Sequence, residues 1–273
     1  MKIITPEISV IIPVYKAHST LERAISSINN QLYDQDKIEI ILSVDDNSKY
    51  DHFKLLNKNI RILNPSGKLR TGAGEARNRG IKIARGKIIG FLDADDTWSS
   101  NYLCELKPIA MRYGMAITKT EILNQNGNYL FTLDPGYNFE IKHFGLLPGS
   151  FHPLVLKKLA GPFPDGASQD VIHCINLLKK IPYRSKIPSH SKYQIWLNEK
   201  SKTFQKDFSK LVDNSYKYWR HYYFKELKVE NSFTNIQIVR VLQNKIIWNN
   251  KFMKSKNERS EEHTSELQSP MYL

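Results

Sequence analysis

The sequence predicts an α/β protein: an open, mostly parallel twisted sheet flanked by helices and followed by a C-terminal helical appendage. Three observations support this fold class. Short apolar runs alternate with segments of helical periodicity through about the first 180 residues, which is typical of strands joined by crossover helices. Residues 203–223 and 236–246 then repeat apolar side chains at helical spacing without intervening strands. With 273 residues, 41% of them hydrophobic, the chain can bury a full core.

The first elements follow in order from apolar patterning. Residues 8–14 are a continuous apolar run that ends at a turn, as expected for a buried parallel strand. A helix is expected over 21–31, introduced by a capping-box pattern at 19–22. Similar apolar runs predict further strands over 38–44, 60–63 and 87–92. A glycine-bearing loop at 66–74 leads into a helix that ends at Ala84, between the last two strands.

The second half of the chain is patterned less regularly. Residues 115–122 and 129–133 flank Asn126-Gly127, which predicts a hairpin. A helix is expected over 169–179. These patterns divide the chain into three parts: an α/β domain over 1–200, a basic, aromatic-rich helical region over 201–258, and a tail over 259–273.

The tail is predicted to be non-native. It begins RSEEHTSELQS, which is polar and unpatterned and resembles the translation of a sequencing-library adapter. A native chain would then continue past about residue 258. A natural disordered tail is the alternative.

The charge of the chain is concentrated in its C-terminal third. The whole sequence carries a net charge of +13, and residues 179–258 hold 18 Lys and Arg against 6 Asp and Glu. Such an excess favours anionic partners, namely nucleic acid, a membrane surface or a phosphorylated substrate. Aromatic side chains interleaved with these cations suit docking at an anionic membrane surface, and packing on the sheet or on a second copy in a homodimer is the alternative.

The two cysteines, Cys104 and Cys174, exclude a disulfide scaffold and a zinc cluster. No window approaches the length of apolar residues that spans a bilayer, and the N-terminal apolar run is too short for a signal sequence. The expected location is cytoplasmic, with peripheral docking at the inner face of the cytoplasmic membrane left open.

Acidic residues cluster where predicted strands end. Asp45-Asp46 follow the second strand, and Asp93-Ala94-Asp95-Asp96 follow the fourth. Ligands of open α/β sheets bind at this edge, and converging carboxylates repel each other unless a cation lies among them. Oxygen ligands favour Mg²⁺ or Mn²⁺, which bridge to substrate phosphates. For an isolated Asp-Asp pair, simple turn or cap chemistry is the alternative.

The donor-rich segment Arg70–Gly80 suits a diphosphate, because it combines small residues with cations at the start of a helix. Its Gly72-Ala73-Gly74 is not a dinucleotide fingerprint, since it lacks the third glycine and does not follow the first strand.

Taken together, three segments resemble glycosyltransferase family 2, which has the GT-A fold with a Rossmann-like nucleotide-binding half. They are ISVIIPVYKAHSTLERAISSINNQ, IEIILSVDDNS and GAGEARNRGIKIARGKIIGFLDADD, in the order and spacing of the family. The resemblance covers about residues 7–180 and is specific only when the three segments are combined. Stand-alone bacterial members act in cell-surface polysaccharide or lipopolysaccharide assembly.

The resemblance implies a nucleotide-sugar site and a metal-binding DxD motif. Contacts to the nucleotide of a UDP-sugar would come from Pro13, Val14, Tyr15, Asp45, Arg77, Asp93 and Ala94. Asp95 would be the direct ligand of Mg²⁺ or Mn²⁺, with Asp93 touching the ribose or the metal through water, and Asp96 a helix cap. This chemistry is reasonable, because the leaving group is a nucleoside diphosphate whose developing charge a metal stabilises.

An inverting transfer also needs a base for the acceptor hydroxyl. The family places an Asp at the start of a helix after a Gly-Phe turn, and Asp170 matches in GPFPDGASQD. Gln169 stands where the family usually has Glu. Asp165 is the second candidate, and a helix-cap role for either is the alternative.

Three histidines and two aromatic residues are further candidates for the site or its surroundings. His190 could be a third metal ligand, although no spacing supports it. His143 and His173 are expected at the surface or behind the site, while Tyr193 and Trp196 either close over the donor or pack in the core.

The sequence therefore predicts an inverting, metal-dependent glycosyltransferase that moves a sugar from a nucleotide-sugar to a glycan or lipid-linked acceptor. A sugar-phosphate nucleotidyltransferase is the alternative enzyme, but Pro13-Val14-Tyr15-Lys16 lacks its glycine-rich loop. A basic nucleic-acid-binding protein is the third hypothesis. No recognition motif supports it, so nucleic acid is not an expected partner.

Overall fold

The computed structural model describes residues 5–136, 139–147, 149–181, 188, 190–197, 207–229 and 232–261. Its main sheet has six strands in the order β3-β2-β1-β4-β9-β6. The first four are parallel, as predicted, and the last two run antiparallel to their neighbours. Their bounds are β1 Ile8–Val14, β2 Ile38–Val44, β3 Ile60–Leu63, β4 Ile88–Phe91, β6 Met115–Ala116 and β9 Leu154–Leu156.

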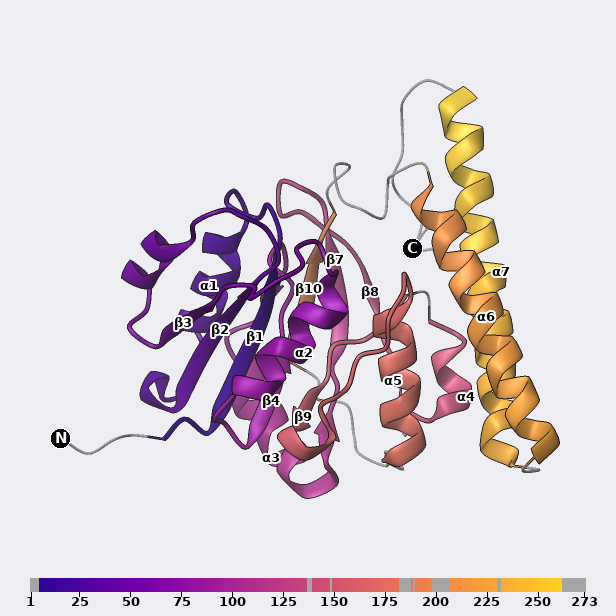
Figure 1. Ribbon diagram of the computed structural model, residues 1–273, viewed down its shortest axis with the longest axis horizontal. Helices are drawn as coiled ribbons and strands as arrows, with labels where there is room; N and C mark the ends of the chain where they lie inside the picture. Colours follow the sequence, from indigo (N-terminus) through magenta and orange to yellow (C-terminus); the bar gives the residue numbers. More distant parts are fainter. Residues whose placement is uncertain are drawn as a thin grey trace.

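Helices cover both faces of this sheet (Figure 1). Alternate residues of β1 point to opposite sides, so Val10 and Ile12 pack with α1 (Leu21–Asn29) and α3 (Tyr102–Tyr113) in one apolar cluster. Ile11 belongs to the other cluster, which includes buried residues of α5 (Gln169–Lys180) and receives side chains of α2 (Ala73–Ile83). The sheet is thus buried on both sides, which explains the continuous apolar runs of its parallel strands.

A second, four-stranded sheet has the order β5-β10-β7-β8. Its strands are β5 Thr97–Trp98, β7 Lys119–Leu123, β8 Tyr129–Leu133 and β10 Lys192–Trp196. The hairpin around Asn126-Gly127 is confirmed by the antiparallel pairing of β7 with β8. The single strand expected over 115–122 was wrong, because the chain crosses between sheets there: β6 lies in the main sheet and β7 in the second.

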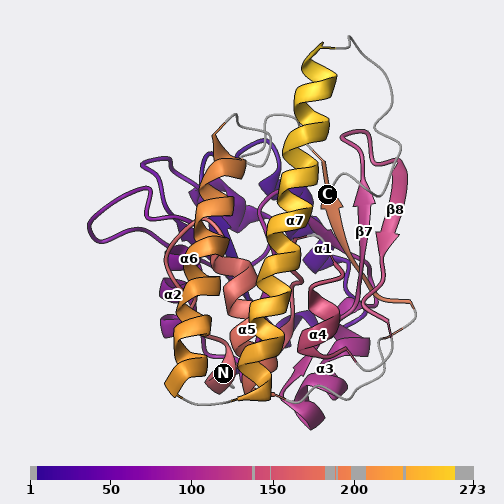
Figure 2. The ribbon, with the colours of Figure 1, turned by 90° about the vertical axis from the view of Figure 1, so that its right-hand side faces the viewer.

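Two long helices, α6 (Phe208–Val229) and α7 (Phe233–Glu261), form the C-terminal appendage. They run side by side beyond α5 and α4 (Ile141–Phe144), as Figures 1 and 2 show. Both predicted helices are present, although α6 lies further along the chain than 203–223, whose first residues fall outside the described part. α7 continues three residues into the predicted tail, and residues 262–273 lie outside the description. No helix among the described residues is long and apolar enough to cross a membrane.

The capping box expected at 19–22 is not formed. Thr20 is the N-cap of α1, and its side chain caps no backbone amide. The hydroxyl of Thr20 instead donates to the carbonyl of Ala17 at 3.3 Å. The first turn is stabilised by burial of Leu21 and Ala24, which outweighs a missing cap.

Candidate active site

The predicted nucleotide-binding residues lie at the carboxyl edge of β1, β2 and β4. At the end of β1, Val14 is buried and Tyr15 is 44% exposed, while Pro13 is half-buried within the strand. The turn that follows has Lys16 at φ 51°, and its amide donates to the carboxylate of Asp46. The Asp46 carboxylate also accepts from the hydroxyl of Tyr50 at 3.0 Å. Asp46 therefore holds the β1 turn against the end of β2.

Asp45 anchors the glycine-bearing loop that precedes α2. Its carboxylate accepts hydrogen bonds from the hydroxyl of Thr71 at 2.6 Å and the amide of Gly72 at 2.8 Å. Gly72 adopts φ +93°, a backbone conformation that glycine tolerates without strain. Arg79 of α2 adds an ion pair to Asp45 at 3.1 Å. This network sets the position of the α2 N-terminus next to the strand edge.

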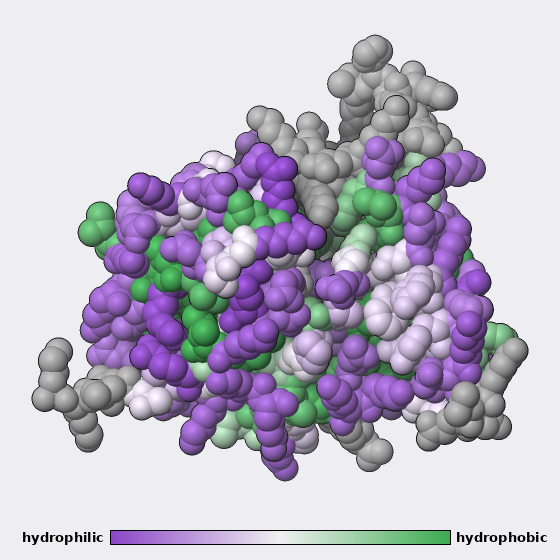
Figure 3. Space-filling view, in the orientation of Figure 1, coloured by the Kyte–Doolittle hydropathy of each residue, from purple (hydrophilic) through white to green (hydrophobic). Residues whose placement is uncertain are grey.

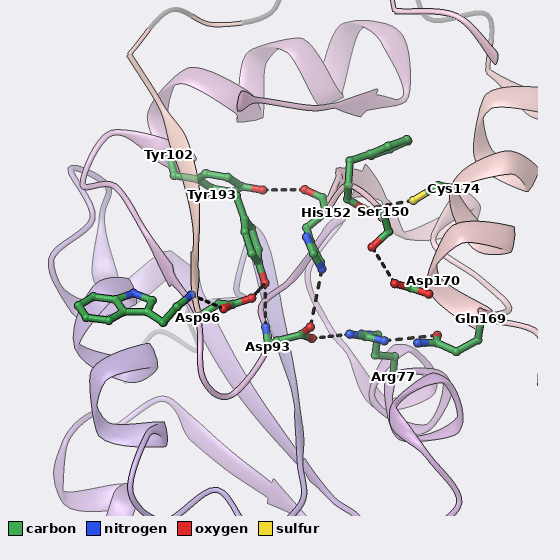
Figure 4. Close-up of polar contacts among 12 residues, drawn as sticks. Arg77, Asp93, Asp96, Tyr102, Ser150, His152, Gln169, Asp170, Cys174 and Tyr193 are labelled. Carbon is green, nitrogen blue, oxygen red and sulfur yellow. Dashed lines mark hydrogen bonds and ion pairs between the residues drawn. The ribbon is translucent and has the colours of Figure 1, made fainter. Parts of the chain in front are cut away.

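Asp93, the first acid of the predicted DxD motif, is paired with Arg77 of α2 (Figure 4). Arg77 is 3% exposed, and its guanidinium also donates to Gln169 of α5 at 3.3 Å. On the other side, His152 Nε2 lies 3.7 Å from Asp93 Oδ2. Burial opposes ionisation, but the positive charge of Arg77 and the contact with His152 hold the pKa of Asp93 well below its usual value. Asp93 is thus a carboxylate held between the Arg77 guanidinium and the His152 ring.

Asp95 is the acid of the motif whose negative charge is least compensated by nearby cations. Burial, and then the charge of Asp93, raise the pKa of Asp95 above its ordinary value. Arg23 donates to the backbone carbonyl of Asp95 at 2.7 Å, so it orients the loop and leaves the carboxylate side chain to other partners. A cation beside Asp95 would relieve this unfavourable charge.

The residues present fit a Mg²⁺ or Mn²⁺ ion held mainly by Asp95. Such ions use one or two carboxylates together with substrate phosphates rather than a complete protein cage. Among the described residues no group of three ligating side chains gathers, and His190 lies exposed before β10. The five clustered carboxylates also need less cationic compensation than expected, because arginines of α2 pair with Asp45 and Asp93.

The expectation that Asp96 caps a helix was wrong. Asp96 is 5% exposed and accepts hydrogen bonds from the Tyr193 hydroxyl at 2.9 Å and the Trp196 amide at 3.2 Å. Burial, reinforced by Asp95 and Asp93, raises the pKa of Asp96 well above its usual value. Tyr193 is itself 1% exposed, so it packs in the core of the second sheet rather than closing over a ligand. Together they fix the motif against β10.

Asp170 lies in the first turn of α5, and Ser150 donates a hydrogen bond to its carboxylate at 2.7 Å (Figure 4). The N-cap of α5 is Ser168, so neither Asp165 nor Asp170 is the cap residue. A cavity of about 360 Å³ is lined by Asp170 and also by Arg77 and Asp93. Asp165, which is exposed, lies on its rim. The predicted base and Asp93 of the DxD motif thus face one cavity, whereas Asp95 is not among its lining residues.

α6 and α7 supply the far wall of this cavity. Their contribution is largely apolar and aromatic, with Tyr216, Trp248 and Phe252 among the lining side chains. The cavity is completed where α2 approaches α5. The two helices are so close there that a Cβ atom on Gly74 would lie 3.0 Å from the Gln169 side chain. Glycine at that position lets the two helix N-termini meet at the cavity.

Several residues of the site were not predicted from sequence. His152 contacts Asp93, Ser150 contacts Asp170, and Lys245 lines the cavity. Each comes from a segment without a recognisable motif. The only available signal was Lys245, a lysine on the otherwise apolar stripe of α7. His173, by contrast, is not at the surface: it is 2% exposed and stacks on Phe163 with ring centroids 3.7 Å apart.

Comparison with known proteins decides the family. Residues 9–145 match the family described as Glycosyl transferase family 2. The chain belongs to that family. It is 32% identical over 184 residues to the Escherichia coli UDP-Glc:alpha-D-GlcNAc-diphosphoundecaprenol beta-1,3-glucosyltransferase WfgD, covering 63% of this chain and 70% of WfgD. It is 27% identical to Glycosyltransferase GlyG of Streptococcus pneumoniae, covering 63% of this chain and 56% of GlyG.

Solved structures confirm the GT-A fold of the family 2 chain. S. aureus TarS 1-349 in complex with UDP-GlcNAc superposes with a TM-score of 0.66 at 16% identity, covering 97% of this chain and 78% of that one. The mannosyltransferase PcManGT from Pyrobaculum calidifontis, in complex with GDP-Man and Mn²⁺, superposes with a TM-score of 0.60 at 13% identity, covering 96% and 77%. The glycosyltransferase hypothesis is confirmed over the nucleotidyltransferase and nucleic-acid-binding alternatives.

Proposed function

We propose that this glycosyltransferase is an inverting, metal-dependent enzyme that transfers a sugar from a UDP-sugar to a sugar linked through diphosphate to a lipid. The observation that carries the proposal is the single cavity shared by Asp93 and Arg77 on one side and Asp170 on the other. The UDP-sugar and the lipid-linked acceptor are supported by the similarity to WfgD, a UDP-Glc:alpha-D-GlcNAc-diphosphoundecaprenol beta-1,3-glucosyltransferase. Assembly of a cell-surface polysaccharide is the corresponding process.

The reaction follows from the placement of the carboxylates. Asp170 takes the proton of the acceptor hydroxyl as that oxygen bonds to the anomeric carbon. The bond from this carbon to the diphosphate breaks on the opposite face, and the electron pair leaves with the nucleoside diphosphate, which inverts the configuration. Asp95 would hold a divalent ion, which would supply positive charge for the departing diphosphate. Arg77 holds the Asp93 carboxylate in place through an ion pair.

The nucleotide is proposed to bind along the β1 and β2 ends. Pro13, Val14 and Tyr15 lie at one side of this edge and Asp45 at the other, with Asp93 and Ala94 following β4. Asp45 already accepts three hydrogen bonds from the loop and α2. Its role toward the nucleotide is therefore expected to include shaping the loop as well as direct contact.

A panel of nucleotide-sugars tests the donor. With Mn²⁺ present, a UDP-sugar should raise the melting temperature, because a ligand that binds only the folded state stabilises it. GDP-sugars serve as the matched control and should leave it unchanged. Transfer is then measured with a sugar-diphosphate-lipid acceptor and with the same sugar lacking the lipid. Failure of every UDP-sugar to bind or react would reject the proposed donor.

We also infer that the C-terminal helices dock on an anionic membrane surface at the cytoplasmic face. The exposed side of α6 carries Tyr218 and Tyr222, 64% and 43% exposed, and Figure 3 shows side chains of intermediate hydropathy over α6, bordered by hydrophilic ones. Exposed Lys217 and Lys225 lie on the same helix. Rings at the interface and cations near anionic lipid both favour docking.

Vesicle co-sedimentation tests the docking. Binding to anionic but not to neutral vesicles, lost at high salt and in the double variant Tyr218→Ser and Tyr222→Ser, is the expected result. An exposed pair far from α6, Leu55→Ser and Leu56→Ser, is the control. Absence of binding to either vesicle would favour the alternative, in which α6 and α7 only complete the architecture or join two copies.

A further inference from the structure

Lys245 of α7 is a charged side chain in an apolar setting. It is 1% exposed and lies next to Leu242 and Ile246 on the buried face of the helix. Its ammonium has three partners: the carbonyl of Leu147 at 2.6 Å, the carbonyl of Gly149 at 2.5 Å, and the ring of Phe144 at 3.8 Å from its centroid. These satisfy the three donors of the amine. Burying an ammonium is costly, so its partners are expected to matter.

The segment that Lys245 holds leads directly into both halves of the site. We call residues 149–153 the bridging loop. Ser150 of this loop donates to Asp170 at 2.7 Å, and His152 lies 3.7 Å from Asp93 (Figure 4). The loop thus joins the proposed base to the DxD motif.

The bridging loop has no regular secondary structure, so side chains from other elements set its position. Tyr102 of α3 donates to the carbonyl of His152 at 2.9 Å, and Cys174 of α5 to the carbonyl of Phe151 at 3.1 Å. Lys245 holds the end nearest to Ser150. The end that orients Asp170 therefore depends on a residue almost a hundred positions later in the chain.

We propose that Lys245 is a positioning residue for the base: it fixes the Gly149 end of the bridging loop, and through Ser150 it sets the orientation of the Asp170 carboxylate. This inference rests on the proposed role of Asp170. Because Lys245 acts through the loop, it affects the chemical step rather than binding of donor or acceptor. We assign Lys245 no direct contact with substrate, because its ammonium donates hydrogen bonds to two backbone carbonyls.

A double-mutant cycle on the full chain tests the inference. Lys245→Met and Ser150→Ala should each lower kcat by about 10- to 100-fold, the worth of a hydrogen bond to a charged group. The KM values for donor and acceptor should stay within about twofold of the parent. The double variant should lose little more than either single variant, because both changes break the same link. Arg240→Met, which removes an exposed cation from the same helix, is the control and should retain parental kcat.

The outcomes separate this inference from the proposed function. If Asp170→Asn keeps the parental kcat, the assignment of the base fails. If Asp170→Asn is impaired but Ser150→Ala is not, the positioning role is overturned, even where Lys245→Met does not fold. The positioning role is also overturned if the kcat losses of Lys245→Met and Ser150→Ala add fully in the double variant. A raised acceptor KM at unchanged kcat in Lys245→Met overturns it as well. In the Asp170→Asn background, Lys245→Met should have no further effect on kcat.

Discussion

The two sides of the cavity are built in different ways. On the side of the DxD motif, acids at the strand ends are compensated by buried or half-buried arginines of the neighbouring helix, as in the pairs Arg77 with Asp93 and Arg79 with Asp45. On the opposite side, Asp170 has a serine hydroxyl as its hydrogen-bond partner, carried by the irregular bridging loop. The acids of the first side are held by ion pairs with α2. The second depends on how distant segments pack, which makes it the more sensitive to change at remote positions.

The largest expected effect comes from Asp95, the least compensated acid of the DxD motif. Asp95→Asn removes the charge that would hold a divalent ion while preserving side-chain size, so transfer should fall by about 10³-fold or more. The melting temperature should stay near that of the parent, and the exposed Asp51→Asn is the matched control. Activity is measured with Mn²⁺ titrated against EDTA. Parental transfer by the parent enzyme in EDTA would contradict metal dependence.

The two acids near the α5 N-terminus provide the next comparison. Asp170→Asn should lower kcat by roughly 10²- to 10⁴-fold with donor binding retained, because it removes a general base. Asp165→Asn, five residues earlier and exposed on the rim of the cavity, should stay within about twofold. Steady-state kinetics and donor titration by thermal shift measure the two quantities. The reverse pattern would assign the base to Asp165, and loss of donor affinity in Asp170→Asn would make that residue a binding group.

Removing a charge from the compensated side should cost stability. Arg77→Met leaves Asp93 without its main partner, so the free energy of unfolding should fall by about 2 to 3 kcal/mol. This lies below the cost for a fully buried pair, because the Asp93 side chain is 31% exposed. Lys54→Met, which breaks an exposed pair with Asp51, should change stability by less than about 1 kcal/mol. Urea unfolding measures both. Equal losses of unfolding free energy in the two variants would show that burial of an ion pair does not increase its contribution to stability.

The smallest expected effect is on the pH dependence of stability. It comes from His173, which lies beside Phe151 and His152 of the bridging loop. Burial lowers the pKa of His173 to about 3, from 6.5. The unfolded chain therefore takes up a proton between these values while the folded one does not, so stability is lost as pH falls below about 6.5, by at most about 1.4 kcal/mol per pH unit. His173→Leu should make the unfolding free energy less dependent on pH between 6 and 4. His221→Leu, at an exposed position of α6, should retain the parental slope. A parental slope in both variants would refute the account.

The parallel half of the fold and its acid clusters were predictable because contiguous segments of the sequence encode them. β1, β2 and β4 are buried on both faces, so their sequences are mainly apolar, and each ends next to the residues of the candidate site. The place of Asp170 in the first turn of α5 also agrees with the family resemblance, while its role as the base stays a prediction. The strands β5 and β9 were not predicted, because two or three residues carry no periodicity of their own.

By itself, the sequence determined the fold class, the family and the acids at the strand ends, since local apolar patterning and short motifs encode them. Only the tertiary structure decided how those acids are used. It paired Asp93 with Arg77, buried Asp96 against Tyr193 and left Asp95 as the least compensated acid of the motif. It also brought Lys245 to the bridging loop and Ser150 to Asp170. The physical reason is that the ionisation and orientation of a carboxylate depend on burial and on neighbours from other elements, and no spacing along the chain records those neighbours.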